Sequence, residues 1–277
     1  MADTQLQIPS GLVCITTHGS ITQETTQAIM DLKEHSAKAG LSNVQYQIVP
    51  GSLVDKARND ACRIALRNGC GWLVFLDADC VFTPDSLLGM LQTAYGSHPF
   101  ADVLGAWNPL RGEMALPTID TGTGTWESHY PGSGVKEVMR TGGAYLLVKR
   151  HVLERLKDPW FAMRVPARAV DFMAELDNFA RIKFDGRNPL RGLTGQPWEK
   201  LEQCAQQDPS ANGQWTPAEV GEDSGFCDRV KLEGFRIFVN TDIACGHVDR
   251  RVWTWRDHKI AVENIEKQHR QCAGMSA

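Results

Sequence analysis

Two aspartates that are separated by one residue, Asp77 and Asp79, follow an apolar run that begins at Trp72. An apolar run of this length, bounded by turn residues on both sides, is typical of a buried strand. Both carboxylates would then lie at the carboxyl end of the strand, where open α/β sheets bind their ligands. Such a pair suits a divalent cation and the phosphates that it carries. The alternative is that the aspartates only cap the next helix.

Three further groups could take part in chemistry. Glu222 and Asp223 stand at a predicted helix start, where one of them could act as a general base for a hydroxyl or bind it. They could equally complement the helix dipole. His247 follows a predicted strand, and imidazole joins carboxylate and phosphate oxygens in Mn²⁺ sites, although a lone histidine is more often structural. The stretch Lys56–Asn59 could reach a diphosphate or form a solvated helix face.

Strands and helices alternate in the first part of the chain. This rhythm predicts βαβ units in an α/β fold, with a mixed, mainly parallel sheet flanked by helices. The predicted elements are a strand over Gly11–Thr17, a helix from a capping box at Ser20–Gln23 to Gly40, a strand over Val44–Val49, a helix through Val54, Ala57, Ala61 and Ile64, the Trp72 strand, a helix with Thr83 as N-cap and Pro84 at its first position, and a strand over Val103–Trp107.

The second part of the chain is less regular. Asn108 to Val138 is predicted to be a long loop or an irregular hairpin, and Pro159 to Pro217 an insertion packed on the core of a single domain. Regular structure is expected around these segments: a strand after Gly142 and Gly143 that runs to Val148, a helix near His151–Leu156, a helix over Glu222–Glu233, a strand over Arg236–Asn240 followed by Ile243–His247, and a helix over Val252–Gln271.

Composition excludes several classes of protein. The chain has 277 residues, of which 42% are hydrophobic and 22% charged, as expected of one folded domain. Its net charge of −4 argues against strong non-specific binding of nucleic acid. The eight cysteines contain no C-x-x-C pair, which favours buried free thiols over disulfides or zinc ligands. Without a membrane span or a signal-peptide pattern, a soluble, cytoplasmic protein is expected.

Four motifs, taken in chain order, resemble the glycosyltransferases of the GT-A fold, nearest to glycosyltransferase family 2. They are L-V-D-K-A-R-N-D-A, W-L-V-F-L-D-A-D-C-V-F-T-P-D-S-L, T-G-G-A-Y-L-L-V-K-R and G-E-D-S-G-F-C-D-R-V-K-L-E-G-F-R-I-F-V-N-T-D-I-A-C-G-H. The resemblance covers about Leu12 to Trp107 and Thr141 to His247. It implies a Rossmann-like GT-A fold, a nucleotide-diphosphate sugar as donor and Mn²⁺ or Mg²⁺ as cofactor. Residues 1–110 would bind the nucleotide sugar and residues 111–277 the acceptor.

The resemblance also implies a role for individual residues. Asp79 would bind the metal directly, Asp77 would help to hold metal and ribose, and His247 would complete the coordination. Asp223, next to Glu222 in the E-D motif, would be the catalytic base if the reaction inverts configuration; in a retaining reaction one of the two would orient the acceptor. Contacts to the nucleotide would come from Thr16, Thr17 and Arg58, and the border between donor sugar and acceptor from Gly142 and Gly143. The first strand departs from the family, because it ends in I-T-T-H-G.

The acceptor hydroxyl is left open by the sequence. It could belong to a saccharide or lipid-linked sugar, to a protein, or to a hydroxymethylated pyrimidine in DNA, as modified by phage-type glycosyltransferases. Basic and aromatic side chains of the insertion could bind phosphates and stack on a base, or form a solvated surface over core tryptophans: Arg164, Arg168, Arg181, Lys183, Arg187, Arg191, Trp160 and Trp198.

Two other functions fit part of the pattern. A sugar-phosphate nucleotidyltransferase also uses an α/β sheet with acidic metal ligands, but it carries a glycine-rich basic loop after the first strand. Thr16–Ser20 contains no lysine or arginine. A non-catalytic module that binds nucleotide sugars is the third reading, and the presence of both acidic motifs argues against it.

Overall fold

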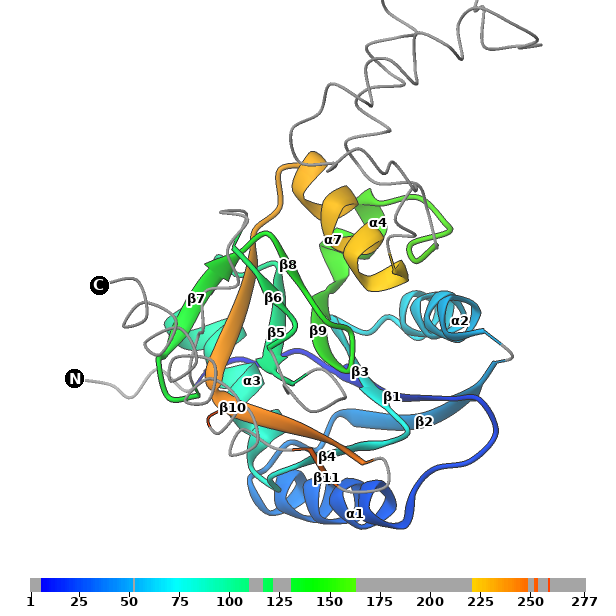
Figure 1. Ribbon diagram of the computed structural model, residues 1–277, viewed down its shortest axis with the longest axis vertical. Coiled ribbons are helices and arrows are strands. Elements are labelled where there is room, and N and C mark those ends of the chain that lie inside the picture. The colour runs from blue at the N-terminus through cyan, green and yellow to red at the C-terminus, as the bar shows by residue number, and fades with distance from the viewer. Residues whose placement is uncertain are drawn as a thin grey trace, which may run out of the picture.

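The computed structural model of the protein describes residues 6–51, 53–109, 117–121, 131–162, 221–248, 252–253 and 259. Its centre is a sheet with the strand order β11-β10-β5-β9-β3-β1-β2 (Figure 1). The bounds of these strands are β1 (Gly11–Thr17), β2 (Val44–Pro50), β3 (Trp72–Asp77), β5 (Val103–Trp107), β9 (Tyr145–Lys149), β10 (Ile237–Val248) and β11 (Val252–Trp253).

The sheet is mixed but mainly parallel, as predicted. β1 pairs in parallel with β2 and β3, and β5 pairs in parallel with β10. β9 lies between β3 and β5 and is antiparallel to both, so β3 and β5 share one direction. Consequently the carboxyl ends of β1, β3 and β5 and the start of β9 lie at the same edge of the sheet.

Short strands complete the sheet at β10 and form a small second one. β4 (Cys80–Phe82) and β7 (Val135–Val138) each pair antiparallel with β10. β6 (Ile119–Asp120) and β8 (Arg140–Thr141) form a two-stranded sheet of their own. The segment expected to be a loop or an irregular hairpin therefore contributes short strands where it is described.

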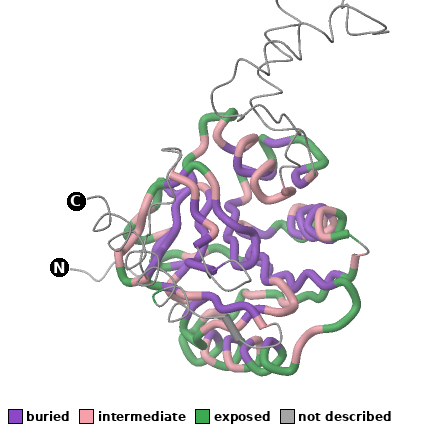
Figure 2. Tube along the Cα trace, in the orientation of Figure 1, coloured by how far each residue is buried: buried purple, intermediate pink, exposed green. Residues whose placement is uncertain are grey.

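Helices cover both faces of the sheet. Successive side chains of a strand point to opposite faces, and the side chains on both faces are apolar. Leu73 and Phe75 of β3 belong to one core cluster, and Trp72, Val74 and Leu76 to the other. α2 (Val54–Arg67), α4 (Arg150–Arg155) and α7 (Glu222–Leu232) lie over the first cluster; α1 (Gln23–Lys38), α3 (Ser86–Gln92) and the π-helix η1 (Thr93–Ser97) lie over the second. Figure 2 shows the buried positions concentrated along the strands.

Several predicted boundaries were wrong. The N-cap of α1 is Thr22, which accepts a hydrogen bond from Thr25 N (3.2 Å), because Ser20 still belongs to the turn after β1. α3 begins at Ser86 and not after Thr83, since a turn over the intervening residues precedes it. The predicted strand over Arg236–Asn240 continues to Val248 as β10, with an irregularity between Asn240 and Ala244.

The C-terminal segment also differs from the prediction. Val252–Trp253, expected to open a helix, forms β11 against β10; most of the remaining predicted helix lies outside the described residues. So does most of the predicted insertion, from residue 163 onward. Among the described residues, no helix is both long and apolar enough to cross a membrane.

The burial of the thiols is as predicted where they are described, and none of these thiols is in a disulfide. All of them are buried and free: Cys14, Cys62, Cys70, Cys80, Cys227 and Cys245. Cys204 and Cys272 lie outside the described residues.

Gly11→Ala should destabilise the protein, because β1 and β3 meet there at close range. A Cβ at this position would lie 2.0 Å from the Trp72 ring, which is itself fully packed. Overpacking of this kind costs about 1–3 kcal/mol in free energy of unfolding. Urea unfolding would measure it, with Gly96→Ala as the control, since that Cβ would meet nothing closer than 3.6 Å. Equal midpoints for the two variants would contradict the prediction.

Candidate functional site

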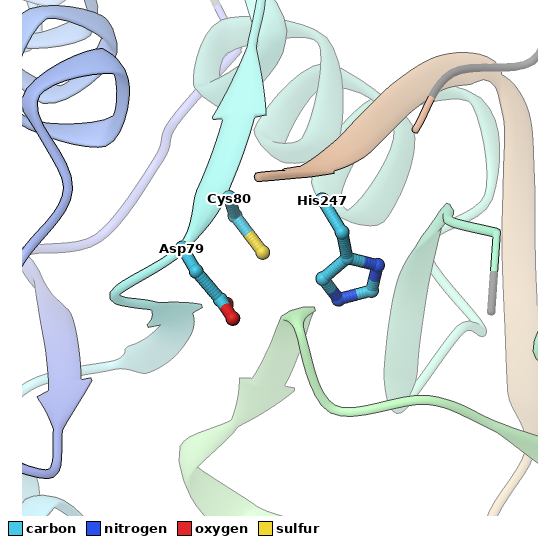
Figure 3. Close-up of side chains that lie close together, drawn as sticks. All are labelled: Asp79, Cys80 and His247. Carbon is cyan, nitrogen blue, oxygen red and sulfur yellow. The ribbon is translucent and has the colours of Figure 1, made fainter. Parts of the chain in front are cut away.

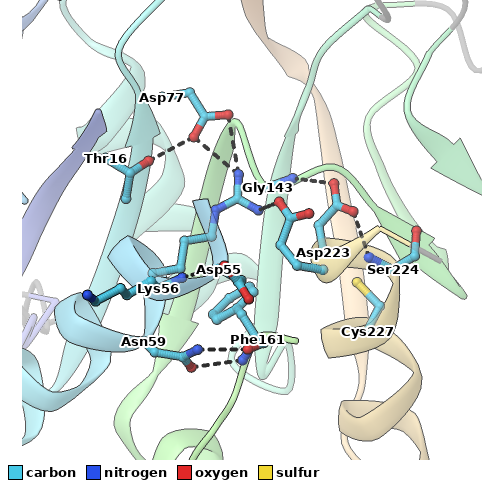
Figure 4. Close-up of polar contacts among 12 residues, drawn as sticks. Thr16, Asp55, Lys56, Asn59, Asp77, Gly143, Phe161, Asp223, Ser224 and Cys227 are labelled. Atoms are coloured by element: carbon cyan, nitrogen blue, oxygen red, sulfur yellow. Dashed lines mark hydrogen bonds and ion pairs between the residues drawn. The ribbon is translucent and has the colours of Figure 1, made fainter. Parts of the chain in front are cut away.

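The acidic motifs meet at the edge of the sheet where β3 ends and β9 begins. Asp77 is the last residue of β3, and its backbone N–H donates to the carbonyl of Ala144, just before β9 (3.0 Å). The start of α7 reaches the same turn, since Gly143 N donates to Asp223 Oδ2 (3.2 Å). Residues far apart in the chain thus form one cluster, shown in Figure 4.

Arg58 of α2 joins the two acidic motifs. Its guanidinium donates through Nη2 to both oxygens of Asp77 (3.1 and 3.3 Å) and through Nη1 to Glu222 Oε1 (2.8 Å). The side chain of Arg58 is only 3% exposed, and its cation lies 5.6 Å from the centroid of the Phe161 ring. Buried charges persist in folded proteins when they are paired and hydrogen-bonded, and this one is held by two carboxylates.

Gly142 and Gly143 allow the backbone to approach this cluster. A Cβ on Gly143 would lie 2.4 Å from Arg58 Nη1, and a Cβ on Gly142 would lie 2.7 Å from Thr118 Oγ1. Both distances are shorter than van der Waals contact allows. The glycine pair that the sequence singled out is therefore required by close packing against polar side chains, of which Arg58 is buried.

The carboxylates of the cluster differ in their electrostatics. Burial alone would raise the pKa of Asp77, but the Arg58 guanidinium and the hydroxyl of Thr16, which donates to Oδ1 (2.9 Å), hold it below its ordinary value. For Glu222 burial prevails and raises the pKa, against the opposing effect of Arg58. Asp77 is thus held as an anion, and Glu222 takes up a proton more readily than an exposed glutamate does.

Asp223 is held by backbone groups. Its Oδ1 accepts from Ser224 N (2.7 Å), and its Oδ2 accepts from Gly143 N. Two N–H donors fix the plane of the carboxylate at the first turn of α7, where the helix dipole also favours an anion. A carboxylate fixed in this way can accept a proton from a hydroxyl placed beside it.

A second cluster contains Asp79, Cys80 and His247 (Figure 3). Cys80 and His247 are direct partners across the antiparallel pair β4–β10, and Val248 N donates to the carbonyl of Asp79 (2.7 Å). The potential ligand atoms of the three side chains lie within 4.8 Å of one another. A carboxylate oxygen and an imidazole nitrogen suit Mn²⁺, so the predicted pair Asp79 and His247 fits such an ion.

The tautomer of His247 follows from its hydrogen bond. Nδ1 lies 2.8 Å from the carbonyl oxygen of Pro109, which can only accept, so Nδ1 carries the proton. In the neutral ring the lone pair is then on Nε2. Ligating histidines are commonly oriented in this way by a carbonyl on the other nitrogen.

Some candidates lie apart from both clusters. Thr17 donates to Ser20 O (2.8 Å) and accepts from Gly19 N (3.1 Å), so it stabilises the turn after β1. Asn59 bonds the backbone of Phe161 in both directions (2.7 and 2.9 Å), which is a structural role. Trp160 is buried and donates to Leu153 O (2.8 Å), so it belongs to the core. Trp198 and the basic side chains proposed to bind DNA lie outside the described residues.

Cys80 was missed as a potential ligand. It lies next to Asp79, but the three-residue strand β4 was not predicted, and only that strand places it opposite His247. The signal was a short apolar stretch, C-V-F, directly after D-x-D.

No protein-family model matches the chain, and no curated protein matches it significantly in sequence. Among solved structures, the chain is similar to A197 from STIV, with a TM-score of 0.52 and 17% identity over 90% of this chain and 91% of that one. Two further solved structures are similar at lower TM-scores. GalNAc-T7 solved with UDP, GalNAc and Mn²⁺ has a TM-score of 0.46 and 10% identity over 93% of this chain and 48% of that one. A glycosyltransferase involved in glycosylation of the major capsid of PBCV-1 has a TM-score of 0.31 and 13% identity over 54% of this chain and 69% of that one. The similarity to A197 shows a shared fold and nothing more.

Proposed function

We propose that the protein is a metal-dependent glycosyltransferase of the GT-A type, which transfers a hexosyl group from a nucleotide-diphosphate sugar to a hydroxyl. The observation that carries the proposal is the buried bridge of Arg58, which binds Asp77 of the D-x-D motif and Glu222 of the E-D motif. Two motifs that resemble one enzyme family in sequence are thus joined by one buried arginine, which supports a donor site next to the E-D motif.

The donor side of the site is assigned to the ends of β1 and β3. Asp79 and His247 would hold Mn²⁺ or Mg²⁺, which when bound neutralises the charge of a diphosphate leaving group. Asp77, kept anionic by Arg58 and Thr16, would bind the ribose and help to orient the metal ligands. Thr17 and Gly142 would shape the walls of the nucleotide and sugar pockets.

Asp223 is assigned the role of general base. Its carboxylate is fixed by the N–H groups of Gly143 and Ser224 and would accept the proton of the acceptor hydroxyl in an inverting reaction. In a retaining reaction the same geometry would orient that hydroxyl. The acceptor remains a choice between a saccharide and a hydroxymethylated pyrimidine in DNA, and both belong in the assay.

A donor panel tests the proposal. Thermal unfolding with Mn²⁺ and each of several nucleoside-diphosphate sugars should show one donor that stabilises the protein, by about 2.7 kcal/mol when the donor is a hundredfold above its Kd. Mass spectrometry of acceptors incubated with that donor should show one added hexose. Pyrophosphate release from a nucleoside triphosphate and a sugar 1-phosphate would indicate a nucleotidyltransferase instead. Donor binding without turnover on any acceptor would indicate a non-catalytic module.

Asp79→Ala and His247→Ala should each abolish the Mn²⁺-dependent part of this stabilisation and of turnover, because each removes a metal ligand. Both variants should remain folded, as judged by circular dichroism. The matched control is Glu34→Ala, which removes an exposed carboxylate that pairs with Lys38 on α1. Wild-type Mn²⁺ dependence in both site variants would refute the metal assignment.

A further inference from the structure

We infer that Asp79, Cys80 and His247 form a three-ligand site that binds a thiophilic divalent ion, namely Zn²⁺. No nucleotide is needed for this binding. The inference rests on the metal position of the proposed function, which it extends by one ligand. A zinc ion held there would occupy the position that Mn²⁺ needs.

The backbone places the three side chains together. Cys80 and His247 are opposite each other across β4 and β10, and side chains at such paired positions project from the same face with Cβ atoms about 4.5–5.5 Å apart. Asp79 comes from the turn before β4 and is tied to β10 by the bond from Val248 N. Figure 3 shows the carboxylate, the thiol and the imidazole facing one common space.

Distances and burial suit an enclosed ion. The donor atoms lie within 4.8 Å of one another, and tetrahedral zinc ligands at about 2.0–2.3 Å from the metal need only a small rotation to converge from there. Cys80 is fully buried and His247 is 8% exposed, whereas Asp79 is half-buried. An ion would therefore enter from the side of Asp79, and this side would also be the open fourth position.

The donor set distinguishes two kinds of metal. Mn²⁺ and Mg²⁺ prefer oxygen, so they would use Asp79 and His247 and take their remaining ligands from a diphosphate and water. Zn²⁺ accepts sulfur, nitrogen and oxygen together, and three protein ligands with one open position are its usual arrangement in reactive sites. The order of divalent affinities also favours Zn²⁺ over Mn²⁺ at any such site. On binding, the Cys80 thiol would release its proton to solvent as the sulfur–metal bond forms.

Cobalt substitution tests the inference without nucleotide or acceptor. The full chain, reduced and freed of metal, is titrated with Co²⁺. Wild-type protein should develop a thiolate-to-cobalt charge-transfer band in the near ultraviolet, and one equivalent of Zn²⁺ should remove it. Cys80→Ser should lose the band and bind Co²⁺ and Zn²⁺ at least tenfold more weakly. Cys70→Ser, which changes a buried thiol between α2 and β3, should keep it.

Each outcome decides for or against the site. No band in the wild type, a band that persists in Cys80→Ser, or equal loss in Cys70→Ser would overturn the three-ligand set. If Cys80→Ser fails to fold, zinc-edge X-ray absorption of the wild type decides: one sulfur at about 2.3 Å supports the site, and a shell without sulfur overturns it. If the protein shows the band but transfers no sugar, only the proposed transferase is refuted. If it transfers sugar but shows no sulfur ligation, only this inference is refuted.

Discussion

Asp223→Asn should lower turnover by about 10²–10⁴-fold, the usual contribution of a general base. Asparagine preserves the size of the side chain and can still accept a hydrogen bond from Gly143 or Ser224, but it cannot take a proton from the acceptor hydroxyl. Donor binding should therefore remain close to that of the wild type. Single-turnover rates on the identified acceptor would separate the chemical step from binding.

The control for this variant lies on the same helix. Asp228→Asn alters a carboxylate of α7 that pairs with Arg140 outside the bridge of Arg58, and its turnover should stay within a few-fold of the wild type. A comparably small loss in Asp223→Asn would exclude the base role and leave Asp223 as an orienting group. The anomeric configuration of the product, determined by nuclear magnetic resonance, would then be expected to match that of the donor.

Arg58→Leu should reduce the free energy of unfolding by about 3–5 kcal/mol, because it leaves carboxylates without their buried cation. Asp77 and Glu222 both depend on this one guanidinium, and their side chains are only 24% and 14% exposed. Urea unfolding near neutral pH would measure the loss. Removing one of the orphaned charges in Arg58→Leu/Glu222→Gln should recover part of it.

Arg67→Leu provides the matched comparison, since Arg67 is an exposed arginine in the last turn of α2. Its effect should stay within about 0.5 kcal/mol, as for most surface substitutions. Similar losses for Arg58→Leu and Arg67→Leu would mean that the bridge contributes little to stability.

The order of the main elements could be predicted from the sequence because their apolar patterns are long. β1, α2 and β3 match their predicted ranges closely, and the α/β fold with a mixed, mainly parallel sheet is confirmed. Short elements could not be predicted in this way. β4 has three residues, too few for a period to be visible, and β11 has two. These strands exist because β10 offers backbone partners, which is a tertiary effect that local sequence does not contain.

The site was predictable as a list of residues but not as a set of partners. D-x-D, E-D and the glycine pair could be singled out, because their order along the chain resembles the motifs of one enzyme family. That Arg58 bonds both acidic motifs could not be predicted, since Arg58 and Glu222 are 164 residues apart in the chain. The roles assigned to the site residues stay predictions until the variants are measured.

The hydrogen bond from Val248 N to the Asp79 carbonyl affects how the protein binds a metal. It belongs to the ladder that already aligns the Asp79 turn with β10, so the backbone around both ligands is ordered before any ion arrives. Metal binding would then cost little conformational entropy, whereas a loop that folds around its ligand loses much of it. Amide hydrogen exchange at Val248 should accordingly be slow in the metal-free protein and change little on addition of Mn²⁺.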